Sequence, residues 1–193
     1  PLLEIAESQA LDRINRRNNY DWVKDSFMNL KEKLSLSSLD RIEAFDISHN
    51  QGNQVTASCV SFTDSGPDKK NYRSMNITLE KNDDYLALSE AVRRRLKNLK
   101  ENNKAFPDLL VIDGGKGQLN SVVNEMKKND FGTLNIISIS KGPQRNEKYD
   151  EIHLSKHPFK LNIADLKGSS KLIQLIRNVS HRFAIKKLSL IHI

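Results

Sequence analysis

Two aspartates in this sequence, each within or directly after an apolar run, are the first candidates for catalytic or metal-binding residues. Asp113 follows Leu109–Ile112 directly, and Asp46 is the acid of a second run, Arg41–His49. Four consecutive apolar residues predict a short strand that is buried on both faces. An acid at the carboxyl end of such a strand, followed by glycines that let the backbone turn sharply, is a place where α/β proteins do chemistry.

Both carboxylates emerge at the same edge of a sheet if their strands are neighbours. Two anions that close repel each other and raise the pKa of one of them, unless a cation lies between them. Hard oxygen ligands with few protein contacts suit Mg²⁺ or Mn²⁺, and such a metal activates bound water and offsets charge on a phosphodiester. Either acid alone is explained by a turn or a cap, but the joint placement of Asp46 and Asp113 favours a metal site.

A third candidate, His181, lies on the last predicted helix, Ser169–Ala184. It shares a face with Gln174, Arg177 and Asn178, opposite the apolar residues of that helix, so it is not a core histidine. Its imidazole is either a plain surface group or one aimed at a site, where it accepts a proton from water or binds a metal. The sequence leaves both interpretations open.

The glycines and lysine after Asp113 do not make a nucleotide-binding loop. Lys116 is followed by Gly117, so the spacing of a P-loop is absent, and we reject binding of a nucleoside triphosphate. Lys116 is interpreted as a phosphate contact or as the exposed first turn of a helix that begins at about Gln118.

The elements that position these residues follow from hydrophobic periodicity. Strands are predicted at Arg41–His49, Val55–Phe62, Lys70–Ile77, Leu109–Ile112 and Asn135–Ser140. Helices are predicted from Asp83 and Asp84, over Gln118–Lys128 and over Ser169–Ala184, and Glu147–Lys160 is interpreted as a hairpin insertion. A three-strand antiparallel meander followed by helix, strand, helix, strand and helix predicts an α/β protein whose mixed five-stranded sheet has the order of the RNase H-like fold.

Three segments are expected along the chain. Residues 1–40 form an N-terminal helical extension and linker, residues 41–185 the core domain, and residues 186–193 a tail from which nothing is inferred. The sequence begins with Pro1, not Met, so we expect a piece of a longer protein.

Composition limits the class of protein. The 193 residues carry a net charge of +7, which is compatible with a polyanionic partner and equally with ordinary solubilising charge. The single cysteine, Cys59, excludes an internal disulfide framework or a thiolate metal site, and a reducing, cytoplasmic setting is expected. No apolar run is long enough to span a membrane, and no signal peptide is recognisable.

Several motifs, in the same order along the chain, closely resemble the C-terminal endonuclease half of the UvrC family of excinuclease proteins. The run from Ile112 to Leu119, with its Asp-Gly-Gly-Lys-Gly-Gln string, is the most specific of them. The others are Phe45–His49, Asp83–Tyr85, Arg93–Arg95 and Ile176–Ala184. The likeness covers about Arg41 to Ile185 and implies an RNase H-like domain that cuts the damaged strand 5′ of a lesion in bacterial nucleotide excision repair, with a divalent metal.

The resemblance also implies roles for residues and partners. The catalytic Asp, Asp and His of the family fall on Asp46, Asp113 and His181, and Asp84 matches a further acid that helix capping explains equally well. Candidate phosphate contacts are Arg94, Lys116 and Arg182. Damaged double-stranded DNA is the implied substrate, and UvrB is an implied partner through regions of the family's proteins that this sequence lacks.

The sequence also departs from the family pattern. Asn178, Val179 and Ser180 stand where the family usually has two acids just before the histidine, which changes the hydrogen bonding expected around His181. A catalytically inactive, nuclease-derived DNA-binding or protein-docking module is the alternative function, and a resolvase- or transposase-like relative is a weaker one.

Overall fold

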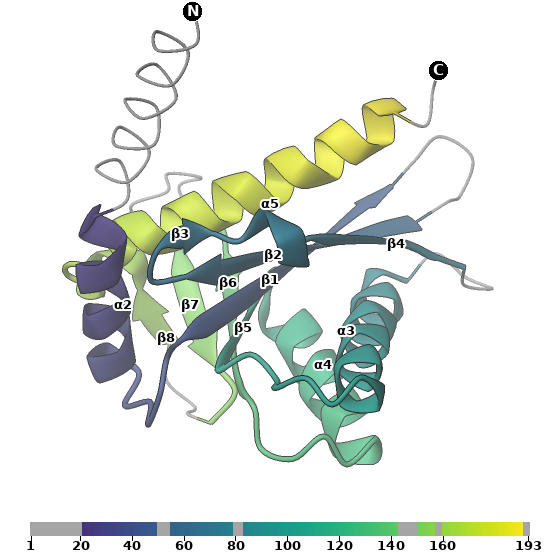
Figure 1. Cartoon of the computed structure of the whole chain (residues 1–193), viewed down its shortest axis with the longest axis horizontal. Helices are drawn as coiled ribbons and strands as arrows, with labels where there is room; N and C mark the ends of the chain where they lie inside the picture. Colours follow the sequence, from purple (N-terminus) through teal and green to yellow (C-terminus); the bar gives the residue numbers. More distant parts are fainter. Residues whose placement is uncertain (1–20, 50–54, 79–82, 143–149, 157–159, 191–193) are drawn as a thin grey trace, which may run out of the picture.

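One mixed sheet with helices on both faces forms the body of the chain (Figure 1). The computed structural model describes residues 21–49, 55–78, 83–142, 150–156 and 160–190. Within them the sheet has eight strands in the order β3-β2-β1-β5-β6-β7-β8, and β4 also pairs with β2. The strands are β1 Arg41–His49, β2 Val55–Thr63, β3 Gly66–Pro67, β4 Arg73–Ile77, β5 Leu109–Asp113, β6 Asn135–Ser140, β7 Glu151–Leu154 and β8 Lys160–Asn162.

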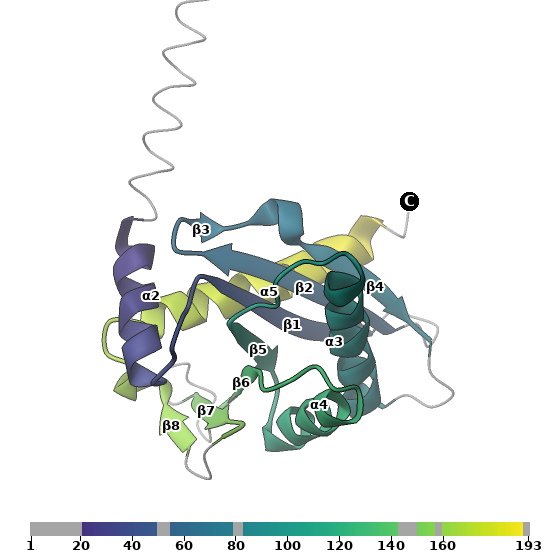
Figure 2. The same cartoon turned by 60° about the horizontal axis from the view of Figure 1, so that its bottom comes forward.

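The central strands β1, β5 and β6 run parallel, and the outer strands are antiparallel. Two helices cover each face of this sheet, as Figures 1 and 2 show from different sides. The helices are α2 Asp21–Lys33 and α5 Ser170–Leu190 on one face, and α3 Asp84–Glu101 and α4 Lys116–Lys128 on the other, with short 3-10 turns η1 Lys69–Asn71 and η3 Ile163–Asp165. Coverage on both faces explains why β5 is a continuous apolar run.

Alternation along the strands decides which side chains meet which helices. In β1, Ile42 and Ala44 belong to the core cluster that includes α5 residues, whereas Phe45 belongs to the cluster under α3 and α4. In β5, Val111 faces α5 and Ile112 faces α3 and α4. The next residue of each strand is an aspartate, so both aspartates are on the α5 side of the sheet.

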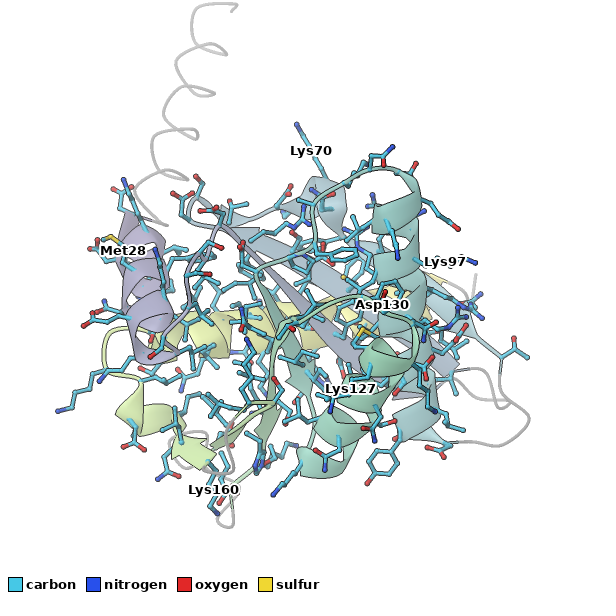
Figure 3. The ribbon with its side chains drawn as sticks, turned by 90° about the horizontal axis from the view of Figure 1, so that it is seen from below. Met28, Lys70, Lys97, Lys127, Asp130 and Lys160 are labelled. Carbon is cyan, nitrogen blue, oxygen red and sulfur yellow. The ribbon has the colours of Figure 1, made fainter. Side chains whose placement is uncertain are left out.

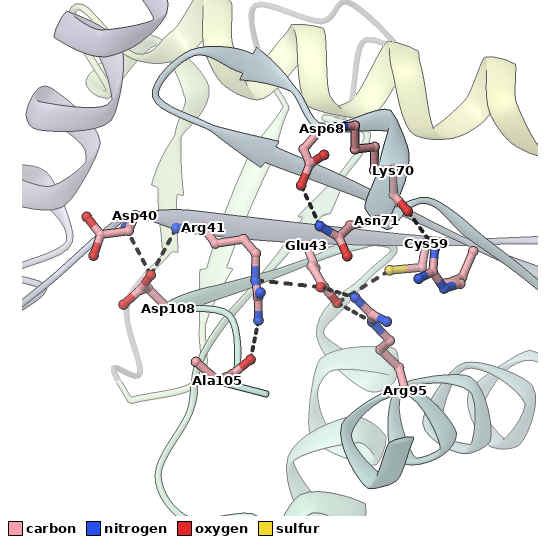
Figure 4. A network of polar contacts seen from close by, with 11 residues as sticks. Asp40, Arg41, Glu43, Cys59, Asp68, Lys70, Asn71, Arg95, Ala105 and Asp108 are labelled. Carbon is pink, nitrogen blue, oxygen red and sulfur yellow. Dashed lines mark hydrogen bonds and ion pairs between the residues drawn. The ribbon is translucent and has the colours of Figure 1, made fainter. Parts of the chain in front are cut away.

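A buried ion pair fixes α3 to the opposite face (Figure 4). Arg95 donates to both carboxylate oxygens of Glu43, at 2.9 and 2.6 Å, and both side chains are buried. Cys59 also contacts Glu43, with its Sγ 3.5 Å from Oε2, and burial is the main cause of the raised pKa of this thiol. This network therefore has a structural role on the α3 side of the sheet.

The predicted α/β order with three antiparallel strands first is confirmed, with corrections to its extent. The five predicted strands are present, but β3, β7 and β8 extend the sheet beyond five, and β7 and β8 pair as the hairpin expected in that region. The third predicted strand begins at Arg73, not Lys70, because residues 69–71 form the 3-10 turn η1, in which the Asn71 N–H donates to the Asp68 carbonyl at 3.1 Å.

The ends of the helices also differ from expectation. Helix α4 begins at Lys116, two residues earlier than predicted, and α5 continues to Leu190. Residues 50–54, between the first two predicted strands, and the first 20 residues of the N-terminal extension lie outside the described residues. Helix α2 packs into the core through Val23, Phe27 and Leu30, and the domain limits at 40 and 185 stay predictions.

The excess positive charge is distributed over the surface. Figure 3 shows Lys70, Lys97, Lys127 and Lys160 pointing outward from four different elements. Among the described helices, none combines the length and the hydropathy that crossing a membrane requires.

Candidate active site

Asp46 and Asp113 lie side by side where the parallel pairing of β1 and β5 ends. Asp113 is the last residue of β5, whereas Asp46 lies within β1, which continues to His49. The register of β1 and β5 pairs Ala44 with Val111 and Phe45 with Ile112, and the two aspartates are the next residues. Burial, and then the nearby charge of Asp113, raise the pKa of Asp46. The two carboxylates therefore repel each other on the same face of the sheet.

His181 approaches this pair from α5. Its Nδ1 lies 3.4 Å from Oδ2 of Asp46, and its side chain is 65% exposed. The histidine partly opposes the rise in the pKa of Asp46, since its charge and its hydrogen bond favour the carboxylate. The structure thus brings together the three residues that the sequence singled out, 135 positions apart in the case of Asp46 and His181.

Two residues at this site had no role assigned from the sequence. Arg177, one helical turn before His181, has its Nε 3.2 Å from Oδ1 of Asp113, and its Nη1 donates to Oδ2 of Asp150. The helical spacing had already placed Arg177 and His181 on one face, which is the signal that could have identified it. Asp150 gave no such signal, because it is one of several charged residues in a weakly patterned segment and Glu151 follows it directly.

The glycine turn after Asp113 holds a helix cap. The N–H of Gly114 donates to the carbonyl of Ile139 at 2.9 Å, which ties the turn to β6. The N–H of Gly115 donates to Oε1 of Gln118 at 2.7 Å, and a Cβ on Gly114 would lie 2.1 Å from that oxygen. Gln118 thus occupies the space over the turn, and Lys116 is exposed on the first turn of α4.

Asp84 makes a different contact from the one that capping predicts. Its Oδ1 lies 2.6 Å from Nε2 of His49, and both side chains are about half exposed. The cap of α3 is Asp83, whose Oδ1 accepts from the N–H groups of Tyr85 and Leu86 at 2.8 and 3.2 Å. Capping therefore explains Asp83 and not Asp84, which lies on α3, across the sheet from the helix that carries His181.

The two candidate phosphate contacts outside the glycine turn are placed differently. Arg94 is engaged within the fold, since its Nε donates to Glu90 at 2.6 Å and its Nη1 to the carbonyl of Asn76 at 3.0 Å. Arg182 is exposed beside His181, and its Nε donates to the carbonyl of Asn178 at 3.2 Å.

The donor set fits a hard divalent cation with few protein ligands. Two carboxylates on one face are what Mg²⁺ or Mn²⁺ accepts while keeping bound water. Burial, and then the charge of Asp113, raise the pKa of Asp46, so a cation there would favour its charged form. Within the described part of the chain, no group of three or more His, Cys, Asp or Glu residues is arranged to hold a metal. The fit is thus to the Asp46 and Asp113 pair, with His181 beside it.

Comparison with known proteins gives a consistent assignment. Residues 31–185 match the family described as the UvrC RNAse H endonuclease domain. The UvrABC system protein C of Nitrosococcus oceani is 42% identical over 161 residues, which cover 82% of this chain and 26% of that protein. The protein of the same name from Pseudomonas putida is 37% identical over 190 residues, covering 94% of this chain and 30% of that protein.

The chain spans under a third of the length of these relatives. Among solved structures, human ENDOV is similar with a TM-score of 0.41 and 16% identity, covering 54% of this chain and 47% of that one. A likeness that weak adds nothing to the assignment, which depends on the family match and the identities. The resemblance seen in the sequence motifs is confirmed, and the chain belongs to the UvrC RNase H endonuclease domain family.

Proposed function

We propose that this chain is a metal-dependent endodeoxyribonuclease that makes the incision 5′ of a lesion in bacterial nucleotide excision repair. The observation that carries the proposal is the convergence of Asp46 and Asp113 on neighbouring parallel strands, with Nδ1 of His181 3.4 Å from Oδ2 of Asp46. Membership of an endonuclease domain family supports the reaction class.

A divalent cation held by Asp46 and Asp113, Mg²⁺ or Mn²⁺, would supply an acidified water and positive charge for the phosphodiester. Water attacks phosphorus, the bond to the 3′ oxygen breaks, and the products are a 3′-hydroxyl and a 5′-phosphate. His181 takes the proton of the attacking water through its Nε2, since its imidazole is exposed and holds Nδ1 toward Asp46. The departing 3′ oxygen takes its proton from solvent.

Two exposed cations flank this arrangement and are proposed to hold the DNA backbone. Lys116 lies three residues after Asp113 at the start of α4, and Arg182 follows His181 on α5. Cations that contact phosphates position the duplex without reading its sequence. Arg94 is a weaker proposal, because Glu90 already accepts from it.

The proposed substrate is damaged double-stranded DNA in the cytoplasm, with UvrB as partner of the longer protein. Since the relatives named for the UvrABC system are more than three times as long as this chain, lesion choice and partner binding belong to the whole protein.

The test is an incision assay on a duplex with one lesion, titrated with Mn²⁺ and followed by mass analysis of the ends. Asp113→Asn should lower incision by at least about 100-fold, because charge stabilisation by a metal is worth several kcal/mol. The fold should be retained, as judged by circular dichroism. An Asn variant that cuts normally contradicts the proposal, and metal-independent DNA binding with no cleavage would favour the inactive docking module.

A further inference from the structure

Arg177 links a carboxylate of the proposed metal site to one that lies outside it. Its Nε lies 3.2 Å from Oδ1 of Asp113, and its Nη1 donates to Oδ2 of Asp150. The Arg177 side chain is 15% exposed and that of Asp150 only 3%. The contact with Asp150 is a largely buried charge-assisted hydrogen bond, which is strong and directional, and the contact with Asp113, whose side chain is 23% exposed, is an ion pair.

Asp150 is itself fixed by the strands around it. Its Oδ1 accepts from the N–H of Gly142 at 3.3 Å, two residues after the end of β6. Its carbonyl accepts from the N–H of Ile163 at 2.9 Å, just after β8. A carboxylate held from two sides can orient a guanidinium, because that group is planar and presents its donors in a rigid fork.

We propose that Arg177 is a positioning residue for Asp113, with Asp150 as its anchor. The guanidinium takes one oxygen of the Asp113 carboxylate and leaves the second oxygen for the cation. This inference depends on the proposed metal site at Asp46 and Asp113, and it adds two residues that orient one of the metal ligands. Partners of this kind orient metal ligands in many proteins.

The positive charge of Arg177 also opposes metal binding, and the experiment must separate this effect from the positioning of Asp113. A guanidinium repels a divalent cation. Removing the guanidinium would therefore leave the Asp113 carboxylate unpositioned and would also remove that repulsion. Arg177→Lys keeps the positive charge but offers a single nitrogen, which cannot serve Asp113 and Asp150 as the fork does. This variant therefore isolates the positioning role.

The measurement is Mn²⁺ affinity of the whole chain without DNA, from the electron paramagnetic resonance signal of free Mn²⁺. Arg177→Lys should bind Mn²⁺ about 10–100-fold more weakly, the usual cost of losing a supporting contact. Arg95→Lys is the matched control, because it makes the same change in a buried arginine–carboxylate pair on the other face of the sheet. It should lower the thermal unfolding temperature and leave Mn²⁺ affinity unchanged. Equal affinities for Arg177→Lys and the unaltered chain overturn the proposal.

A double-variant cycle tests the anchor. Asp150→Asn weakens Mn²⁺ binding by removing a negative charge and by releasing Arg177. If Asp150 acts through Arg177, adding Arg177→Lys to it should cause no further loss. Additive losses in the double variant would overturn the role of Asp150.

Failure of the underlying metal site gives a different result. In that case the unaltered chain does not bind Mn²⁺, or Asp113→Asn binds it equally well, and the proposed function falls together with the positioning role. Normal binding that depends on Asp113 but is indifferent to Arg177→Lys refutes the positioning role alone.

Discussion

At the scale of single residues, the site concentrates negative charge that the fold only partly compensates. Asp46 is buried beside Asp113, and its pKa is raised first by burial and then by that neighbour. A carboxyl whose pKa is higher in the folded chain than in the unfolded chain binds more protons when folded. Its contribution to stability is therefore lost as the pH rises through the folded pKa.

Asp46→Asn should consequently stabilise the metal-free chain at pH 7. The unfolding temperature of this variant should exceed that of the unaltered chain at neutral pH. The difference should shrink below the ordinary aspartate pKa of 3.8, where the side chain at position 46 is neutral in both proteins. Thermal unfolding followed by circular dichroism across this pH range measures it. Asp25→Asn, at an exposed position on α2, should show no such dependence. A lower unfolding temperature for Asp46→Asn at pH 7 contradicts the argument.

His181 is expected to affect reaction rate without affecting stability. Its side chain is 65% exposed, so His181→Gln removes little packing. Loss of a general base lowers rates by about 10²–10⁴-fold, and incision should fall within that range while the unfolding temperature is unchanged. Asn178→Ala, exposed one turn earlier on α5, is the comparison. Similar losses in both variants would assign the effect to the helix surface and not to the imidazole.

At the scale of elements, the turn between β5 and α4 carries a requirement specific to one of its two glycines. A Cβ on Gly114 would lie 2.1 Å from Oε1 of Gln118, whereas a Cβ on Gly115 meets nothing within 4 Å. Gly115 has extended backbone angles that any residue adopts. Substitutions at Gly114 and Gly115 therefore distinguish a requirement for space beside Gln118 from a requirement for the backbone freedom of glycine.

Gly114→Ala should displace Gln118 and leave the N–H of Gly115 without its partner. Loss of a helix cap costs about 1 kcal/mol, and chemical denaturation should show a decrease of that size. Gly115→Ala should be neutral or stabilise by up to about 1 kcal/mol, because alanine restricts the unfolded chain. Equal destabilisation by the two substitutions would mean that the Gln118 cap is not what requires Gly114.

The basic residues of α3 between Arg93 and Lys97 are paired with carboxylates. Arg95 is buried and pairs with Glu43 of β1. Arg93 and Arg94 pair with Glu90, and Lys97 with Glu101, at partly or largely exposed positions of α3. Exposed pairs of this kind contribute little stability, but each one occupies a cation that composition alone suggests is available to DNA. Lys116 and Arg182, which are exposed and close in sequence to Asp113 and His181, are therefore better candidates for phosphate contacts.

At the scale of the whole molecule, the site depends on how α5 lies on the sheet. Ile176 of α5 is completely buried in the core cluster shared with β1 and β5, and its neighbour Arg177 contacts Asp113. Packing of apolar residues thus places Arg177 and His181 of α5 against the two aspartates. Figure 1 shows this helix lying across the sheet.

Ile176→Ala should lower the free energy of unfolding by about 2–5 kcal/mol, the range for truncating a buried isoleucine. Since a domain of this size loses roughly 2–4 °C per kcal/mol, calorimetry should resolve the change easily. Ile185→Ala, on the same helix with a residue 52% exposed, should change stability by less than about 0.5 kcal/mol. Comparable losses at the two positions would indicate that α5 is not held through Ile176.

The sequence by itself determined the central strands and the two acids that they carry. Strand alternation has a period of two, so the sequence sets the face of each aspartate relative to the other residues of its own strand, and the observed register of β1 and β5 makes the two faces the same. The helical period likewise grouped Arg177 with His181. These are local regularities, and a sequence states them directly.

Only the tertiary structure decided which of these groups touch. His181 was open between surface and site, Arg177 had no role, Asp150 had no signal, and Asp84 was explained by a cap that Asp83 supplies. Each of these outcomes depends on contacts between elements distant in sequence, which are set by how helices cross the sheet. Periodicity defines the face of an element, but packing of the whole chain determines what that face meets.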